Sequence, residues 1–397
     1  MACKNRMACK KYFGLVINRE RLLKNWSQEE LCHGICTVSY LSRIETGKAD
    51  PSDEILHLLF DRLGLVVDET AEQESLDHAE EAYALLFSGM TDKLKEYLRQ
   101  INIEKYRASC AGLDLLLLYK IAFPSDHGIC TAHEGMHECM ERRQLALFRI
   151  IQGKQDEALL IYPNAYTYLQ AGLANYNSGN YISSIDKLQT SYYLAAREGL
   201  AKIMLETKIA LGNCYFNLLD VHNMYHHYET AANLAKAMDD RKALEHIAYY
   251  TASIRINMGE YEKAYRYFST LEDPDILRLH KLAICCEKTG RRTEALTALD
   301  RAEALNPDHD GETLTDLMCR VVRYRLEHED YLEQDEYGEL LLHCYNECLK
   351  ERPAGFEVFH LPWMLEWYKA TRQYKKICEF LSEYPTLSLM NSPAARF

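Results

Sequence analysis

Long apolar runs are absent from this sequence of 397 residues. The longest, Leu115-Leu116-Leu117-Leu118, is far shorter than the roughly 18 to 20 apolar residues that a helix needs to cross a bilayer. The N-terminus is polar and has no apolar signal-peptide core. These absences predict a cytoplasmic protein with no membrane partner.

Sequence signatures of catalysis are also absent. We find no glycine-rich loop of the kind that cradles phosphate, and no Gly-x-Ser-x-Gly or His-Glu-x-x-His motif. The 14 cysteines are scattered without a fixed spacing, which indicates free thiols in a reducing compartment rather than a disulfide framework. The sequence therefore predicts no enzyme activity and no cofactor.

One cluster has the composition of a metal site: Cys130, His133, His137 and Cys139. The two histidines are four residues apart and would share a helix face. However, the order Cys-x₂-His-x₃-His-x-Cys matches no familiar zinc motif, and Cys139 would lie on a different face from His133. We therefore predict no metal site there.

The charge is divided unevenly along the chain. Residues 1–65 contain ten Lys and Arg and eight Asp and Glu, a net charge of +2. The whole chain has a net charge of −13, so residues 66–397 have a net charge of −15. This division favours phosphate contact by the first segment alone.

Residues 14–65 have the apolar spacing of several short helices. Leu15, Leu22 and Leu23 indicate a first helix that ends near Asn25. Ser27 and Glu30 form a capping-box signature for a second helix over residues 28–33, which Gly34 ends. Thr37 can cap a third helix over 38–45, stopped by Gly47, and a fourth begins after Pro51-Ser52, with Ile55, Leu56, Leu59 and Leu63 on its buried side.

Two short helices joined by a tight turn, in a bundle of about five, are the helix-turn-helix arrangement, whose second helix enters the major groove of DNA. Leu41 and Ile44 are three residues apart and should face the core. Arg43 is the best candidate for base recognition because a guanidinium can bridge O6 and N7 of guanine. Gln28 is placed to donate to a phosphate. The predicted DNA-binding residues are Gln28, Thr37, Val38, Ser39, Tyr40, Ser42 and Arg43.

The stretch Ser27-Gln28-Glu29-Glu30-Leu31, followed by residues 34–48 and Pro51-Ser52, resembles the phage-repressor type of helix-turn-helix. Its shortened turn, with Ile35-Cys36, is similar to that of the peptide-pheromone regulators of Gram-positive bacteria, the PlcR, Rgg and PrgX group. The resemblance implies a structural pair between Arg21 and Glu45. It also implies binding to a double-stranded DNA operator as a homodimer.

Beyond residue 70 the sequence repeats itself. Small residues at Gly172, Gly212 and Ala252 recur at a spacing of forty, each followed sixteen residues later by Leu188, Tyr228 or Phe268. This pattern is similar to tetratricopeptide repeats, whose helix pairs stack because one unit cannot bury its own face. A shorter step leads to a unit with Ala283, Leu299 and Pro307, and a weaker unit over residues 146–162 precedes. The family period is about 34 residues, so the longer step predicts longer helices, as in the pheromone-regulator group.

The predicted fold is therefore all-α: a five-helix helix-turn-helix bundle followed by a right-handed tetratricopeptide superhelix. We place the DNA-binding domain at residues 1–67, a linker at 68–80 and the repeat domain at 81–397. The clearest repeats span residues 165–305. The segment from Leu361-Pro362-Trp363 to Tyr384 is expected to cap the array or pair with another subunit.

Asn177, Asn217 and Asn257 recur in register just before the loops, each after a bulky apolar residue. An amide offers one acceptor and two donors, so a row of them can hold the backbone of an extended peptide. A C-cap role is the alternative for each. The resemblance points to peptide binding, because pheromone regulators hold their peptides with groove asparagines. The predicted peptide-binding residues are Asn177, Asn217, Asn257, Tyr176, Phe216, Asn213, Leu173, Tyr249, Tyr250, Ser253 and His280.

These patterns together predict a DNA-binding transcription regulator controlled by a short signalling peptide, of the quorum-sensing type. The alternative is an interaction module whose repeats bind a partner protein, with the helix-turn-helix as a tether or dimerisation element.

Overall fold

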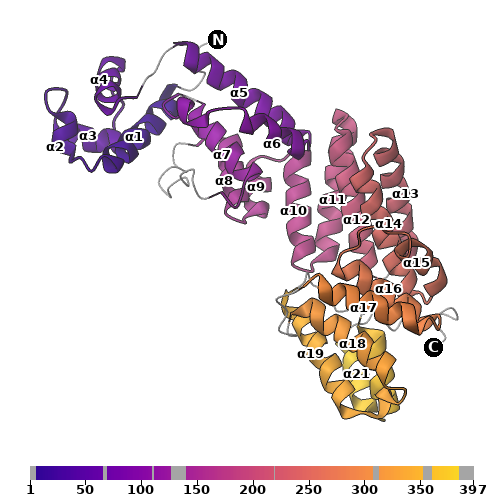
Figure 1. Cartoon of the computed structure of the whole chain (residues 1–397). Helices are drawn as coiled ribbons and strands as arrows, with labels where there is room; N and C mark the ends of the chain where they lie inside the picture. The colour runs from indigo at the N-terminus through magenta and orange to yellow at the C-terminus, as the bar shows by residue number, and fades with distance from the viewer. Residues whose placement is uncertain are drawn as a thin grey trace. The chain divides into compact units, whose positions relative to one another are not determined.

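The computed structural model describes residues 6–65, 69–109, 111–126, 140–218, 220–306, 313–351 and 360–383. Within these ranges the regular structure is entirely helical, as predicted (Figure 1). The chain forms two compact units, Met1–Ala171 with Thr190–Ile203 and Gly172–Gln189 with Met204–Phe397. None of the described helices has the length and apolar character needed to span a membrane.

The N-terminal head consists of α1 (Arg6–Leu23), α2 (Gln28–Cys32), α3 (Val38–Glu45) and α4 (Asp53–Leu63). Residues 6–65 thus hold four helices where five were expected. The head has its own core, formed by Ile17, Leu31, Leu41, Leu59 and Phe60 with their neighbours. Leu22 and Leu23, used to predict α1, are exposed, because α1 turns Val16 and Ile17 to the core instead.

Residues 69–80, which the sequence analysis assigns to a linker, are helical. They belong to α5 (Glu69–Phe87), which packs against α6 (Thr91–Arg99), η1 (Ile103–Tyr106) and α7 (Gly112–Ala122). Ala71, Ser75 and Ala79 are buried on α5 at a spacing of four, the interval that aligns residues on one helix face. This buried stripe keeps the segment helical.

The weak repeat predicted near residue 150 is a helix pair, α8 (Arg142–Ile151) and α9 (Gln155–Ile161), with Gly153 at positive φ in the turn. The clearer repeats follow as α10 (Ala165–Asn177), α11 (Tyr181–Glu198), α12 (Ala201–Asn217), α13 (Val221–Ala237), α14 (Arg241–Asn257) and α15 (Tyr261–Phe268). The helices α11 to α14 have 17 or 18 residues each, as the forty-residue step predicts.

Each clear repeat brings a small residue against a large one. A Cβ atom on Gly172 would lie 2.7 Å from the side chain of Leu188, and one on Gly212 would lie 2.2 Å from the ring of Tyr228. The same register places Ala252 with Phe268, and both are buried in one core cluster. The small residues therefore let the two helices of each pair approach closely.

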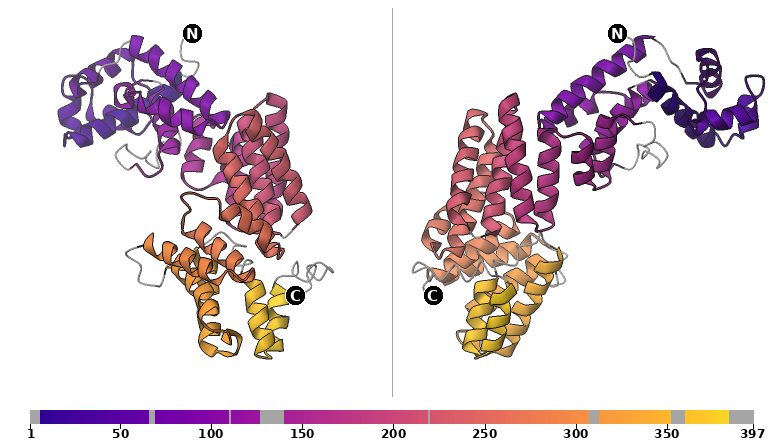
Figure 2. Two further views of the ribbon diagram at one scale, coloured as in Figure 1. Left: turned by 45° about the vertical axis from the view of Figure 1, so that its right-hand side comes forward. Right: turned by 180° about the vertical axis from the view of Figure 1, so that it is seen from behind.

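The remaining helices of the second unit are α16 (Ile276–Lys288), α17 (Arg292–Ala304), α18 (Leu314–Glu327), η3 (Tyr331–Glu333), α19 (Asp335–Glu351), α20 (Leu361–Ala370) and α21 (Tyr374–Glu383). Figure 2 shows α20 and α21, in yellow, beside the orange α18 and α19. Trp363, Met364 and Trp367 are buried in this unit's own core. This burial favours the capping role predicted for the segment.

Replacement of Gly212 by Ala should destabilise the protein, because the new methyl group has no room beside the Tyr228 ring. Overpacking of this kind costs about 1–3 kcal/mol. We expect a lower midpoint of urea unfolding. The double variant Gly212→Ala/Tyr228→Leu places a leucine opposite the new methyl group, as Leu188 lies opposite Gly172. Its loss in the free energy of unfolding should be smaller than the sum of the losses in the two single variants. A loss equal to that sum would show that the two side chains are not in contact.

Candidate functional site

Local interactions set both ends of α2. The Ser27 hydroxyl accepts from the backbone N–H of Glu30 at 3.1 Å, and the Glu30 carboxylate accepts from the backbone N–H of Ser27 at 2.6 Å. The second of these bonds lowers the pKa of Glu30. Gly34 then takes φ of +72°, a left-handed conformation that glycine adopts without strain. The predicted capping box and glycine stop are both confirmed.

The helix α3 has the two faces that the sequence predicts. Leu41 and Ile44 are buried in the head core. Thr37, Val38, Ser39 and Arg43 are exposed, and Tyr40 and Ser42 are half-buried. The Thr37 side chain caps the helix by accepting from the backbone N–H of Tyr40 at 3.2 Å. An Arg43 N–H reaches only the Lys48 carbonyl, at 3.4 Å, so the guanidinium is free to turn to another acceptor.

Glu45, at the end of α3, is the anchor of the head. Its carboxylate accepts from Arg21 Nε at 2.7 Å and from Arg21 Nη2 at 2.9 Å, and both residues are buried. Arg21 also donates to the carbonyl of Trp26, so one guanidinium joins α1, the α1–α2 loop and α3. The pair that the family resemblance implied is present as a bidentate contact.

Two further amides donate to Glu45. Asn18 lies 3.0 Å and Gln28 lies 2.8 Å from Glu45 Oε2. The sequence analysis did not include Asn18, although its position three residues before Arg21 puts both on one face of α1. The sequence analysis assigned Gln28 to a phosphate. In the structure, one amide N–H of Gln28 donates to Glu45 and the other remains for another acceptor.

The three asparagines in register are the last residues of α10, α12 and α14. The Asn217 side chain donates to the Tyr176 hydroxyl at 3.1 Å and to the Asn213 carbonyl at 3.0 Å. Burial raises the pKa of Tyr176, which keeps that hydroxyl protonated. The amides of Asn177, which is exposed, and Asn257, which is half-buried, make no hydrogen bond among the described residues.

Aromatic side chains surround these helix ends. Phe216 meets Tyr250 edge to face, with ring centroids 5.7 Å apart, and Tyr250 also packs against Tyr249 at 5.3 Å. The Tyr228 hydroxyl donates to the Asn213 side chain at 2.6 Å. Leu173, Tyr249 and Tyr250 remain partly exposed, whereas Tyr228 is buried. Lys281 was missed by sequence reasoning: it donates to the Tyr249 hydroxyl at 2.8 Å, a contact between α14 and α16 with no local sequence signal.

Two of the predicted selectivity residues are placed differently from the prediction. Ser253 is 2% exposed, and its hydroxyl donates to the carbonyl of Tyr249 within the same helix. His280 is fully buried, and burial lowers its pKa well below the usual value, so the ring is neutral. Neither side chain can meet a ligand without repacking of the core. The cluster of Cys130, His133, His137 and Cys139 lies outside the described residues.

Residues 17–69 match the family model described as Helix-turn-helix. This range contains α2, α3 and α4, so the predicted helix-turn-helix head is confirmed. Comparison with curated proteins finds no match.

Two solved structures are similar to the chain. One is PlcR of Bacillus thuringiensis in complex with the peptide PapR7 and DNA, at 13% identity over 60% of this chain and 99% of that chain, with a TM-score of 0.31. The other is the apo form of the competence regulator ComR from Streptococcus vestibularis, at 15% identity over 72% of this chain and 99% of that chain, with a TM-score of 0.27. PlcR belongs to the group named by the sequence resemblance. Both TM-scores are low, so neither structure assigns a role to a residue here.

Replacement of Glu45 by Ala should loosen the head strongly, because it leaves the buried Arg21 guanidinium without its carboxylate. Breaking a buried pair costs about 3–5 kcal/mol. We expect faster hydrogen exchange in peptides from α3, measured by mass spectrometry on the full chain.

The exposed neighbours Arg197 and Glu198 provide a control, since Glu198→Ala should have little effect on stability. In the apolar variant Arg21→Met/Glu45→Leu, hydrogen exchange of α3 should be slower than in Glu45→Ala, because no unpaired charge is buried. Unchanged exchange of α3 in Glu45→Ala would contradict the anchoring role.

Proposed function

We propose that this chain is a transcription regulator that binds double-stranded DNA through α3 and is controlled by a short signalling peptide at the ends of α10, α12 and α14. The observation that carries the proposal is the polar, exposed face of α3, held against the head core by the anchor on Glu45. We place the protein in the cytoplasm and assign it no enzyme activity.

The DNA-binding part of the proposal rests on the side chains of α3. Its exposed face carries hydroxyl groups and one guanidinium, which can donate to base edges and phosphates. Arg43 is assigned to base recognition and the remaining amide hydrogen of Gln28 to a phosphate. A homodimer would place two such helices on half-sites about 34 Å apart, one turn of DNA.

Replacement of Arg43 by Ala should weaken specific operator binding by about 1–3 kcal/mol and relax sequence preference at the contacted position. The operator can be obtained by selecting a random duplex library with the full-length protein, and affinity is then measured by gel shift. Arg197→Ala, which removes an exposed arginine far along the sequence, is the matched control and should bind normally. If Arg43→Ala binds the selected duplex with wild-type affinity and still rejects the scrambled duplex as the wild type does, Arg43 does not recognise a base.

The peptide-binding part rests on the spacing of the three asparagines and on their hydrogen bonds. Asn177 and Asn257 carry amides with no partner among the described residues, and each ends a helix that is flanked by tyrosines. Such amides can pair with both the N–H and the C=O groups of an extended backbone. Asn217 is assigned to the same row, and its bond to Tyr176 would be exchanged for a bond to the peptide.

The variant Asn177→Ala/Asn257→Ala should lose peptide binding and keep its fold, because neither amide supports another described side chain. The probe is a synthetic peptide that copies the C-terminus of a small secreted precursor encoded beside the gene, and affinity is measured by calorimetry. A matched control is Asn223→Ala, which removes an asparagine that pairs only with Asp220 at the start of α13.

Circular dichroism and operator binding without peptide should remain as in the wild type, whereas the effect of peptide on operator binding should disappear. If the double variant binds the peptide with wild-type affinity, Asn177 and Asn257 are not peptide-binding residues. If the repeats instead bind a folded partner protein, and no peptide displaces that protein, the alternative of an interaction module is favoured.

A further inference from the structure

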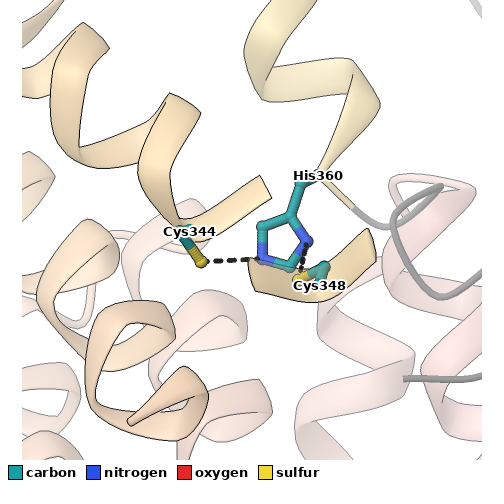
Figure 3. A group of neighbouring side chains, drawn as sticks. All are labelled: Cys344, Cys348 and His360. Carbon is teal, nitrogen blue, oxygen red and sulfur yellow. Dashed lines mark hydrogen bonds between the residues drawn. The ribbon is translucent and has the colours of Figure 1, made fainter. Parts of the chain in front are cut away.

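A second cluster of sulfur and nitrogen ligands lies inside the C-terminal part of the chain, and the sequence pattern gave no sign of it. Cys344 and Cys348 lie on α19, and His360 is the residue before α20. Figure 3 shows the imidazole ring between the two thiols. All three residues have 0% exposed surface.

The three side chains lie in direct contact, with each thiol against a different nitrogen of the His360 ring. Cys344 Sγ lies 3.8 Å from His360 Nε2, and Cys348 Sγ lies 3.6 Å from His360 Nδ1. One ligand atom from each residue lies within 4.8 Å of the others. Among the described residues, these three form the one group of His, Cys, Asp or Glu side chains close enough to hold a metal ion together. The spacing of four residues puts both thiols on one face of α19.

The separation of one ligand atom from each residue, within 4.8 Å, is close to that of ligands around one ion. Zinc binds sulfur at about 2.3 Å and imidazole nitrogen at about 2.0 Å, so ligands of a tetrahedral site are roughly 3.5–3.8 Å apart. A single ion would take one of the two ring nitrogens, so ion binding requires the His360 side chain to shift until one nitrogen faces both sulfur atoms. As hydrogen bonds, in contrast, contacts of a thiol at this length are weak.

The charge balance also suits a buried ion. Two thiolates neutralise one divalent cation. A neutral imidazole, and a water molecule as the fourth ligand of a tetrahedral ion, add no charge, so the complete site would be neutral. Binding releases one proton from each thiol to the solvent. A neutral site avoids the large cost of an unpaired charge in the protein interior.

We propose that Cys344, Cys348 and His360 bind a thiophilic metal ion, Zn²⁺ in the first place, and that the ion ties the start of α20 to α19. The neighbouring core supports a structural role. His360 packs edge to face against Trp363, at 5.6 Å between ring centroids, and Trp367 fills the space left by Gly338 on α19. An ion at this point would hold α20, and with it both tryptophans, in the core of the second unit.

The test uses the untagged full-length protein, purified without chelator. We expect equimolar zinc by metal analysis, and after exchange with Co²⁺ a thiolate-to-cobalt charge-transfer band together with the intense visible bands of a tetrahedral site. Both should be lost in Cys344→Ser/Cys348→Ser. The matched control is Cys285→Ser/Cys286→Ser, which removes two equally buried thiols from α16 and should retain the metal.

The variant Cys130→Ser/Cys139→Ser tests the cluster outside the described residues and should also retain the metal. Because Cys344→Ser/Cys348→Ser is at risk of misfolding, a second measurement uses the wild type: a chelator should lower its melting temperature, and added Zn²⁺ should restore it. His360→Gln should bind Co²⁺ more weakly and with a shifted visible spectrum.

Zinc that stays with Cys344→Ser/Cys348→Ser and leaves with Cys130→Ser/Cys139→Ser would overturn the proposal. So would a wild-type protein that takes up neither Zn²⁺ nor Co²⁺ after reduction of its thiols, or a disulfide between Cys344 and Cys348 in protein kept under reducing conditions.

Discussion

Close approach of neighbouring helices, at points where one side chain is reduced to a hydrogen or a methyl group, is the constraint on which both units depend. In the head, a Cβ atom on Gly14 of α1 would lie 2.1 Å from the Ile44 carbonyl of α3. In the repeats, the side chain of Leu188 packs against Gly172 and that of Tyr228 packs against Gly212. Near the C-terminus, the Trp367 ring packs against Gly338. Packed interiors leave little free volume, so each contact sets the separation of a pair of helices.

The close approach in the head explains why the charged anchor is possible. With α1 directly against the end of α3, Arg21 reaches Glu45 with two nitrogens, and Asn18 reaches the same carboxylate. A buried ion pair is weak evidence for stability, since its attraction is offset by the cost of desolvation. Its geometry is more informative: a bidentate contact holds one orientation of α3. We therefore regard the anchor chiefly as a device that sets the direction of the exposed face.

A second buried arginine shows the same use of charge in the other unit. The Arg325 side chain is fully buried; it donates to Glu287 at 2.8 Å and to the Tyr337 hydroxyl at 3.2 Å. Its guanidinium also faces Trp363, 4.9 Å from the ring centroid. These contacts join α16, α18, α19 and α20. In the described part of each unit, a buried guanidinium thus joins several helices and favours one orientation of them.

The sequence was sufficient where the determinants are local. Ser27, Thr37 and Gly34 act within one helical turn, so the limits of α2 and α3 could be predicted from residue order alone. The forty-residue register likewise placed Asn217 and Asn257 correctly at helix ends. The helix over residues 69–80 was not predicted, because its buried residues are small and give a weak apolar pattern, and α5 packs against α6 and α7 through contacts that are not local.

Tertiary contacts account for the other differences. Periodicity could not show that Ser253 and His280 lie in the core, because the side of a helix that a neighbour covers depends on elements far away in sequence. For the same reason the Cys344, Cys348 and His360 cluster could not be predicted, since it depends on the packing of α20 against α19. Local patterns determine the helices, and the sites arise where separate helices meet.

The proposed DNA and peptide sites differ in how far they are formed in advance. The polar face of α3 is held by the anchor and exposes Arg43, whose bond to a carbonyl at 3.4 Å is long and easily exchanged. In the row of asparagines, Asn217 already satisfies its donors, and a net hydrogen bond contributes only about 0.5–1.5 kcal/mol after such exchange. Asn177 and Asn257 have no hydrogen bond to a described residue to give up. Peptide affinity should therefore come mainly from Asn177 and Asn257, at the two ends of the row, and from contact with the neighbouring tyrosines. Asn217 should set the register of the peptide backbone more than the strength of binding.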